Sequence, residues 1–144
     1  LLRSTMSPGV DADKAVHTFR YAYYPHRGNE KHALVEQKAI AFNILPVLTN
    51  GHNAAALPES FLQTDCTNVE ITAVKKAEDS DRLVVRMYQT DGTESICCVT
   101  LPARVKKVSF CDLMEREAEE VPVENGAVVL KFKPFEIHTI LVEM

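Results

Sequence analysis

The sequence predicts an all-β protein, an antiparallel β-sandwich of two packed sheets with eight or nine short strands and one short helix near residues 30–42. Three observations predict it. Short runs of alternating apolar and polar residues recur about every eight to twelve residues, turn-forming dipeptides separate these runs, and a single segment carries helix-forming residues. We expect one domain over residues 1–144, without internal repeats.

The clearest strand signal is a hairpin over residues 69–88. Two runs rich in aliphatic residues, 69–74 and 83–88, flank the charged segment 75–82. Apolar residues alternate with polar ones in both runs, as in an antiparallel pair with one buried face. We therefore expect this hairpin to form part of the core.

Ahead of the hairpin, residues 17–26 alternate aromatic side chains with others, which favours an aromatic-rich strand. That strand would be either a core-and-edge strand or a platform for stacking on sugar rings. Residues 30–42 are strong helix formers with apolar positions at helical spacing, and Pro46 follows. The longest loop, residues 49–60, has a polar tip that includes His52 and Asn53, and we expect it to form a contact surface.

The C-terminal half reads as further strands joined by turns. Asp91-Gly92 and Asn125-Gly126 are strong turn dipeptides. The acidic residues 114–120 are expected to form a solvated loop, and Asn125-Gly126 to close a second hairpin. The expected strands are residues 61–64, 95–101, 105–113, 121–123, 127–133 and 135–142.

Composition excludes several classes of protein. The formal charge of −4 disfavours nucleic acid and anionic membranes as partners, because both are bound through clustered Lys and Arg. No apolar run approaches the roughly 20 residues of a membrane-spanning helix, and no signal peptide is visible. The first residue is Leu1, which suggests a segment of a longer protein.

The cysteines Cys66, Cys97, Cys98 and Cys111 lack metal or redox spacing, because no Cys-x-x-Cys occurs. We expect reduced thiols packed as small hydrophobes in a cytoplasmic protein. The absence of an Asn-x-Ser/Thr acceptor fits that location.

The sequence contains only weak candidates for catalytic groups. Glu78, Asp79 and Asp81 form the one tight carboxylate cluster, but neighbouring Lys and Arg residues favour a solvated, salt-bridged tip over glycoside hydrolysis. The five histidines show no metal-binding spacing. We therefore predict no catalytic residue and no metal ligand within the chain.

Arg86 is the most informative charged residue, because it opposes the apolar face of its strand. One expectation is an ordinary strand arginine, either exposed or in an ion pair. The other is a guanidinium that holds a carboxylate at a domain interface. Glu136 is the carboxylate that we expect to pair with it.

Several motifs in collinear order resemble the C-terminal domain of the family 38 α-mannosidases. They are Leu-Leu-Arg-Ser at 1–4, Tyr-Ala-Tyr-Tyr-Pro-His at 21–26, Asn43, the hairpin at 73–88, Asp-Leu-Met-Glu at 112–115 and Pro-Phe-Glu-Ile-His-Thr at 134–139. The likeness looks closest to the bacterial and cytoplasmic branch of the family.

This resemblance implies a parent enzyme that is a retaining exo-α-mannosidase. Its N-terminal catalytic domain would hold a divalent metal, usually zinc, and an aspartate nucleophile. The present chain would then be the C-terminal β-sandwich, a fragment that packs on the catalytic domain, helps to wall its cleft and is inactive alone. This fragment would bind no cofactor, and its partner would be the catalytic domain of the same polypeptide.

The residues expected to face that domain or its cleft are Arg86, Glu136, His52 and Asn53. Mannosides at the domain interface and a homo-oligomeric parent stay open as further partners. Two alternatives also stay open: a carbohydrate-binding module, and a purely structural or oligomerising sandwich.

Overall fold

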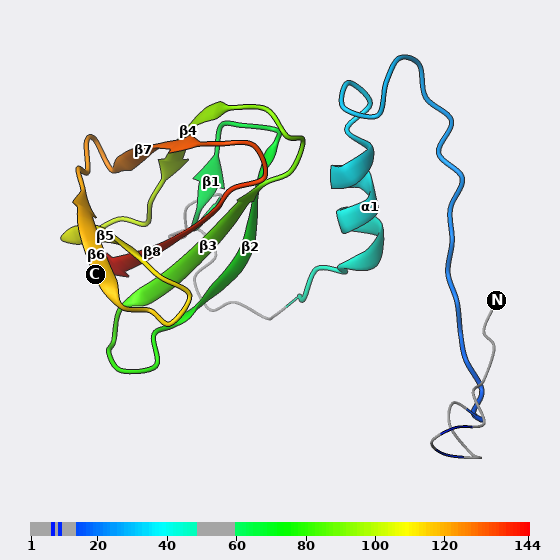
Figure 1. Cartoon of the computed structure of the whole chain (residues 1–144), viewed down its shortest axis with the longest axis horizontal. Coiled ribbons are helices and arrows are strands. Elements are labelled where there is room, and N and C mark those ends of the chain that lie inside the picture. Colours follow the sequence, from blue (N-terminus) through cyan, green and yellow to red (C-terminus); the bar gives the residue numbers. More distant parts are fainter. Residues whose placement is uncertain (1–6, 8, 10–13, 49–59) are drawn as a thin grey trace. The chain divides into compact units, whose positions relative to one another are not determined.

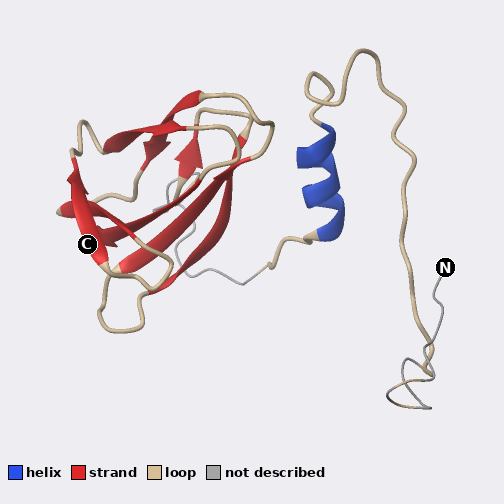
Figure 2. Cartoon of the chain, viewed as in Figure 1, coloured by secondary structure: helices blue, strands red, loops and turns tan. Residues whose placement is uncertain are grey.

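The computed structural model describes residues 7, 9, 14–48 and 60–144. The chain divides into two compact units, Leu1–Ala39 and Ile40–Met144. Among the described residues, one helix (blue in Figure 2) spans the boundary at residues 39 and 40, and the strands (red) follow it in the chain. A single domain over residues 1–144 stays a prediction.

The expected helix is present, with bounds Val35–Asn43 (α1). The preceding residues 30–34 form turns, because Leu34 has a φ of +52° and interrupts the helical backbone. The side chain of Asn29 accepts a hydrogen bond from the His32 N–H at 2.9 Å, which closes the first of these turns. The helix therefore begins five residues later than residue 30, where the sequence pattern places it.

The strand expected over residues 17–26 is wrong. These residues have no regular secondary structure, and the side chains of Tyr21 and Tyr23 are 87% and 91% exposed. An isolated extended segment is not a stable strand, because its backbone N–H and C=O groups need a neighbouring strand. The alternation of aromatic residues predicted a strand, but it carries no information on whether a neighbouring strand is present.

The sandwich itself consists of a three-stranded and a five-stranded sheet, both antiparallel (Figure 1). The smaller sheet has the order β1-β4-β7, and the larger has the order β2-β3-β8-β5-β6. The strands are β1 Gln63–Thr64, β2 Val69–Lys76, β3 Leu83–Gln89, β4 Ser95–Thr100, β5 Lys107–Cys111, β6 Glu117–Val121, β7 Ala127–Phe132 and β8 Ile137–Glu143. The predicted fold class, an antiparallel sandwich of eight or nine strands with one short helix, is confirmed.

The core lies between the two sheets. Alternate residues of β3 and β8, such as Val85, Met87 and Ile140, are fully buried against Leu130 and Phe132 of β7. Burial of each such side chain stabilises the fold by about 1.5–3 kcal/mol. The central hairpin β2-β3 thus forms as predicted, with Ala77 donating to the Arg82 carbonyl at 2.9 Å across its loop.

The acidic residues 114–120 were expected to be a loop, and this is wrong for their second half, which forms β6. β6 is the last strand of the five-stranded sheet, and its carboxylates stay exposed while Val121 enters the core. Charged residues are typical of an edge strand, because they discourage pairing with another chain. The sequence pattern concealed this strand since four of its five residues are Glu or Ala.

The Asn125-Gly126 turn forms as expected. Glu124 and Ala127 exchange two backbone hydrogen bonds of 2.9 Å, and the φ angles of Asn125 and Gly126 are +51° and +77°. These values fit a two-residue type I′ turn. The residues before it do not continue the hairpin, because β6 pairs with β5 while β7 pairs with β4 in the other sheet.

Candidate functional site

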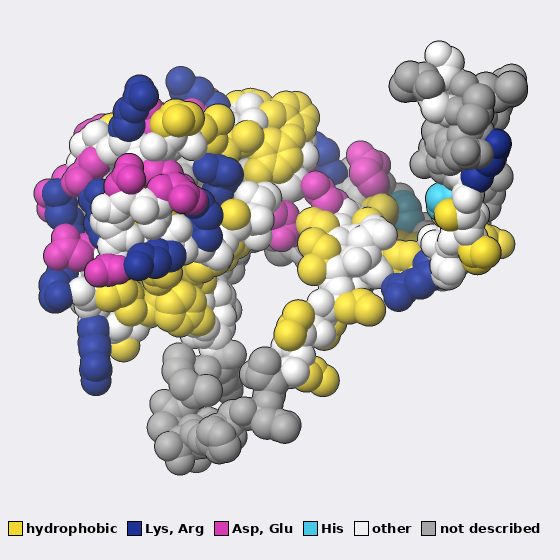
Figure 3. All heavy atoms as spheres, turned by 90° about the horizontal axis from the view of Figure 1, so that it is seen from below, with side chains coloured by type: hydrophobic (Ala, Val, Ile, Leu, Met, Phe, Trp, Pro, Cys, Tyr) yellow, Lys and Arg dark blue, Asp and Glu magenta, His cyan; other side chains and the backbone are white. Residues whose placement is uncertain are grey.

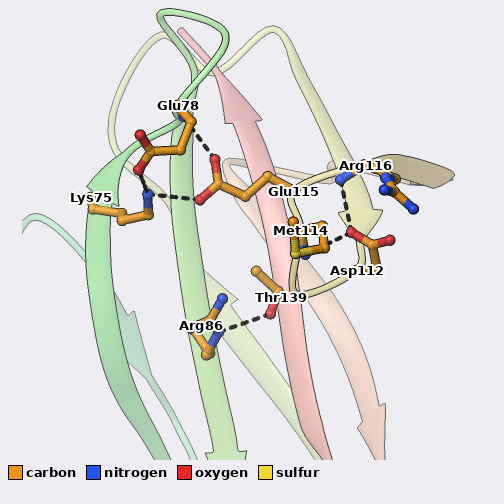
Figure 4. A network of polar contacts seen from close by, with 8 residues as sticks. All are labelled: Lys75, Glu78, Arg86, Asp112, Met114, Glu115, Arg116 and Thr139. Atoms are coloured by element: carbon orange, nitrogen blue, oxygen red, sulfur yellow. Dashed lines mark hydrogen bonds and ion pairs between the residues drawn. The ribbon is translucent and has the colours of Figure 1, made fainter.

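Arg86 lies in the middle of β3 on the face of the five-stranded sheet that points away from the core, since its neighbours Val85 and Met87 face inward. We call this face the outer face. The Arg86 Nε donates to the Thr139 hydroxyl at 3.2 Å, directly across from it on β8 (Figure 4). Arg carries five N–H donors, and this contact uses one of them.

The expected Arg86–Glu136 pair does not form. Glu136 precedes β8, where its carboxylate accepts from the Lys133 backbone N–H at 2.7 Å and lies 3.4 Å from the His138 Nε2. Side chains of successive strand residues point to opposite faces of a sheet. Glu136 keeps the parity of the inward-facing Ile140, whereas Arg86 shares the outer face with Thr139.

Glu115 connects two loops beside Arg86, a contact that sequence reasoning missed. Its carboxylate binds the Lys75 Nζ at 2.7 Å and accepts from the Glu78 backbone N–H at 2.8 Å (Figure 4). The hydrogen bond from Lys75 is the main cause that lowers the pKa of Glu115, and the same contact raises the pKa of Lys75. Glu115 therefore ties the β5-β6 loop to the tip of the β2-β3 hairpin.

The loop that carries Glu115 is closed by Asp112. The Asp112 Oδ1 accepts backbone hydrogen bonds from Met114 at 2.8 Å and from Arg116 at 2.9 Å (Figure 4). These bonds hold Glu115 with a φ of +64°, an uncommon value for a residue with a side chain. The Asp-Leu-Met-Glu motif thus encodes a fixed turn that presents one carboxylate.

A second charged group lies on the outer face around Glu117. Its carboxylate binds the Arg82 guanidinium and the Lys107 Nζ, each at 2.6 Å, and accepts from the Ser109 hydroxyl at 2.8 Å. These contacts, led by Lys107, lower the pKa of Glu117 to about 2. Between the two charged groups lies a small apolar centre, made by Ala77, Val84, Leu141 and Cys111.

A pocket of about 590 Å³ lies beside Thr139, where β5, β6 and β8 meet the β5-β6 loop. Its lining includes Phe110, Leu113, Ile137 and His138. Leu113 and Ile137 are 65% and 52% exposed. Exposed apolar side chains beside a cavity are typical of a surface that another protein or a ligand covers.

The carboxylates at the hairpin tip behave as a solvated cluster. Glu78 pairs with Lys75 at 2.5 Å and Asp81 with Lys76 at 2.6 Å, and the side chains of Glu78 and Asp81 are 78% and 97% exposed. Figure 3 shows acidic and basic side chains intermixed over the visible surface of the sandwich. His52 and Asn53, two of the predicted contact residues, lie outside the described residues.

One group within the described part of the chain has the donor atoms to hold a metal: Asp65, Cys66 and Cys97. Burial raises the pKa of the Cys97 thiol to about 12, and the Cys98 N–H lowers the pKa of Asp65. Sequence spacing gave no signal, because strand pairing brings together cysteines that are far apart in the chain. All four cysteines are free thiols.

No helix among the described residues is long and apolar enough to cross a membrane. The fold defines the described C-terminal part as a two-sheet antiparallel β-sandwich domain. Residues 68–140 match the model of the glycosyl hydrolases family 38 C-terminal beta sandwich domain, and the chain belongs to this family.

Similar proteins extend this match along almost the whole chain. Alpha-mannosidase 2C1 of Homo sapiens is 33% identical over 98% of this chain, and Alpha-mannosidase G of Dictyostelium discoideum is 30% identical over 96%. An Alpha-mannosidase of Saccharomyces cerevisiae is 25% identical over 95%. The chain spans only 13–15% of the length of these relatives.

Proposed function

We propose that this chain is the C-terminal accessory domain of an α-mannosidase that hydrolyses terminal α-mannosyl linkages, and that it packs on the catalytic domain of the same polypeptide and shapes its cleft. One observation carries the proposal: α-mannosidases match 95–98% of this chain, yet the match occupies 13–15% of their own length. Such coverage is expected of one domain within a longer enzyme.

The outer face and the adjoining pocket are the surface that we assign to this docking. Arg86 retains N–H donors beyond the one that it gives to Thr139, and an arginine fork suits a carboxylate or a pair of carbonyl oxygens on the facing domain. The exposed Leu113 and Ile137 would supply apolar contact next to it. A polar anchor beside apolar area is the usual anatomy of a domain interface.

Hydrolysis would then belong to the catalytic domain, which would also hold the divalent metal of the family, zinc in our proposal. The metal polarises or activates groups on the substrate when bound there. This chain would position the catalytic domain and form part of the wall of its cleft, through Arg86 and its neighbours. We place the enzyme in the cytoplasm, in keeping with free thiols at all four cysteines.

A carbohydrate-binding module is the second candidate, favoured by the exposed Tyr21 and Tyr23. Exposed aromatic rings offer apolar faces on which a sugar ring can stack. Calorimetric titration of the 144-residue chain with mannose and with mannan separates the two candidates. A saturable heat of binding that is lost when both tyrosines are changed to alanine would support the binding module. If no heat of binding is measured, the accessory domain is the remaining candidate.

Production of the catalytic part of the parent polypeptide with and without this chain tests the docking role. Co-expression of the 144-residue chain as a separate polypeptide should raise the yield of soluble catalytic part and its cleavage of an aryl α-mannoside. A catalytic part that is equally soluble and active in both cases would contradict the proposal.

A further inference from the structure

Cys66 follows β1, and its sulfur lies close to that of Cys97 in β4, the central strand of the three-stranded sheet. In the β1-β4 ladder Thr64 pairs with Val99, and the Asp65 N–H donates to the Cys98 carbonyl at 3.1 Å. The strand pairing ends there, because the chain bends at Asp65, and Cys66 follows the bend while Cys97 lies within β4.

Asp65 completes a compact set of three donor groups. A carboxylate oxygen of Asp65 and the two sulfur atoms all lie within 4.8 Å of one another. Adjacent residues of a regular strand point to opposite faces of the sheet. The chain bends at Asp65, however, and the side chains of Asp65 and Cys66 lie close together. Two thiols and one carboxylate are the ligand types that zinc-class ions bind in proteins.

The backbone around these residues is already fixed. The Asp65 Oδ1 accepts from the Cys98 N–H at 2.8 Å, and this bond leaves the other carboxylate oxygen of Asp65 for an ion. Asn68, two residues after Cys66, donates to the side chains of Asp91, Thr93 and Ser95 at 3.2, 3.2 and 2.9 Å. Ligands held in this way need little ordering when an ion binds, which favours affinity.

We propose that Asp65, Cys66 and Cys97 form a structural binding site for one divalent metal ion of the zinc class. Each thiol loses its proton to solvent as its sulfur binds the ion, so two protons leave and no electrons move. Asp65 is exposed, and a water molecule on its side would complete the four ligands of a tetrahedral site.

The consequence would be a metal cross-link next to the shortest strand of the described sandwich. β1 has only two residues, and β4 is its only strand partner in the described sheet. An ion that bridges Cys66 to the buried Cys97 would tether the segment after β1 to the core strand. This site is separate from the outer face, and it does not depend on the proposed mannosidase role.

Titration of the reduced 144-residue chain with Co²⁺, followed by displacement with Zn²⁺, tests the site. We expect one ion per chain, a thiolate-to-cobalt charge-transfer band and a higher melting temperature with either ion. Cys66→Ser should weaken binding by about tenfold or more, as should Cys97→Ser, and Asp65→Asn should weaken it less. Cys111→Ser, a thiol on the other sheet, should bind as the wild type does.

Two results would overturn the site: a reduced wild-type chain that gives no charge-transfer band, or binding of equal strength in Cys66→Ser. Cys97 is fully buried, and its serine variant can fail to fold. Cys66 is only partly buried, so Cys66→Ser decides the question in that case.

Discussion

Gly92 in the β3-β4 turn lies against the ring of Phe135, so close that a Cβ on Gly92 would be 2.6 Å from the Phe135 Cζ. Gln89 joins the same two residues, because its buried Oε1 accepts the backbone N–H groups of Gly92 and Phe135, each at 2.9 Å. This contact connects the turn after β3 with the turn before β8. It gives the Asp-Gly dipeptide a packing role besides its turn role.

Gly92→Ala should destabilise the sandwich by about 2 kcal/mol. The backbone φ of +72° costs an alanine about 1 kcal/mol, and the contact with the Phe135 ring adds about 1 kcal/mol. Urea unfolding at neutral pH measures the change.

Gly126→Ala is the matched control, because Gly126 has a φ of +77° and no atom within 4 Å of an added Cβ. It should therefore show the backbone cost alone. Combining Gly92→Ala with Phe135→Ala should remove the excess cost. Equal destabilisation by both glycine variants would refute the packing contact.

Glu117→Gln should lower stability at pH 7, and the deficit should vanish in acid. The folded pKa of Glu117 is about 2 against an ordinary value of 4.5, so its charge stabilises the fold above about pH 4.5. That contribution is lost as the pH falls through the folded pKa. Urea midpoints of the wild type and the variant between pH 7 and pH 2 should converge.

Glu120→Gln serves as the control for Glu117, since Glu120 is 70% exposed and 3.7 Å from Lys107. Its stability should follow the wild type throughout the titration. A constant gap between Glu117→Gln and wild type down to pH 2 would mean that the charge is not the cause.

Glu115→Ala should release the hairpin tip without unfolding the sheet. The Glu78 amide loses its acceptor, and its hydrogen exchange should speed up on the order of tenfold. The Ala77 amide, which donates to Arg82, is an internal reference that should not change. Unchanged exchange at Glu78 would show that the loops are held by other contacts.

Arg86→Ala should cost the isolated chain only roughly 1 kcal/mol, since it removes one hydrogen bond to Thr139. In the parent enzyme the same change should weaken docking and lower mannosidase activity. Thr139→Val removes the same bond and keeps the guanidinium, so it should lower stability and leave docking intact. If both variants affect activity equally, Arg86 acts through the sheet and not at an interface.

Much of the sandwich could be predicted because its signals are local. The central hairpin follows from alternation, and the turn at Asn125-Gly126 from backbone φ preferences. β6 could not be predicted, since Glu and Ala are rare in strands, and the contacts of Glu117 with Lys107 and Ser109 form only across the β5-β6 pair. The prediction of a strand at 17–26 was wrong because these residues alternate as in a strand but have no partner strand.

The candidate site was predictable only in part. Arg86 follows from its parity on a strand, but its partner Thr139 depends on the register of β3 with β8. The cluster of Cys66 and Cys97 likewise depends on pairing across the sheet, which no local spacing reports. Long-range register is the information that the sequence pattern lacks.

We propose that this chain completes an α-mannosidase whose catalytic groups lie elsewhere in the polypeptide. The most direct measurement compares cleavage of an aryl α-mannoside by the full-length polypeptide, by the catalytic part alone, and by the 144-residue chain alone. We predict activity in the first, a large loss in the second and none in the third. Full activity of the catalytic part alone, or cleavage by the 144-residue chain, would contradict the account.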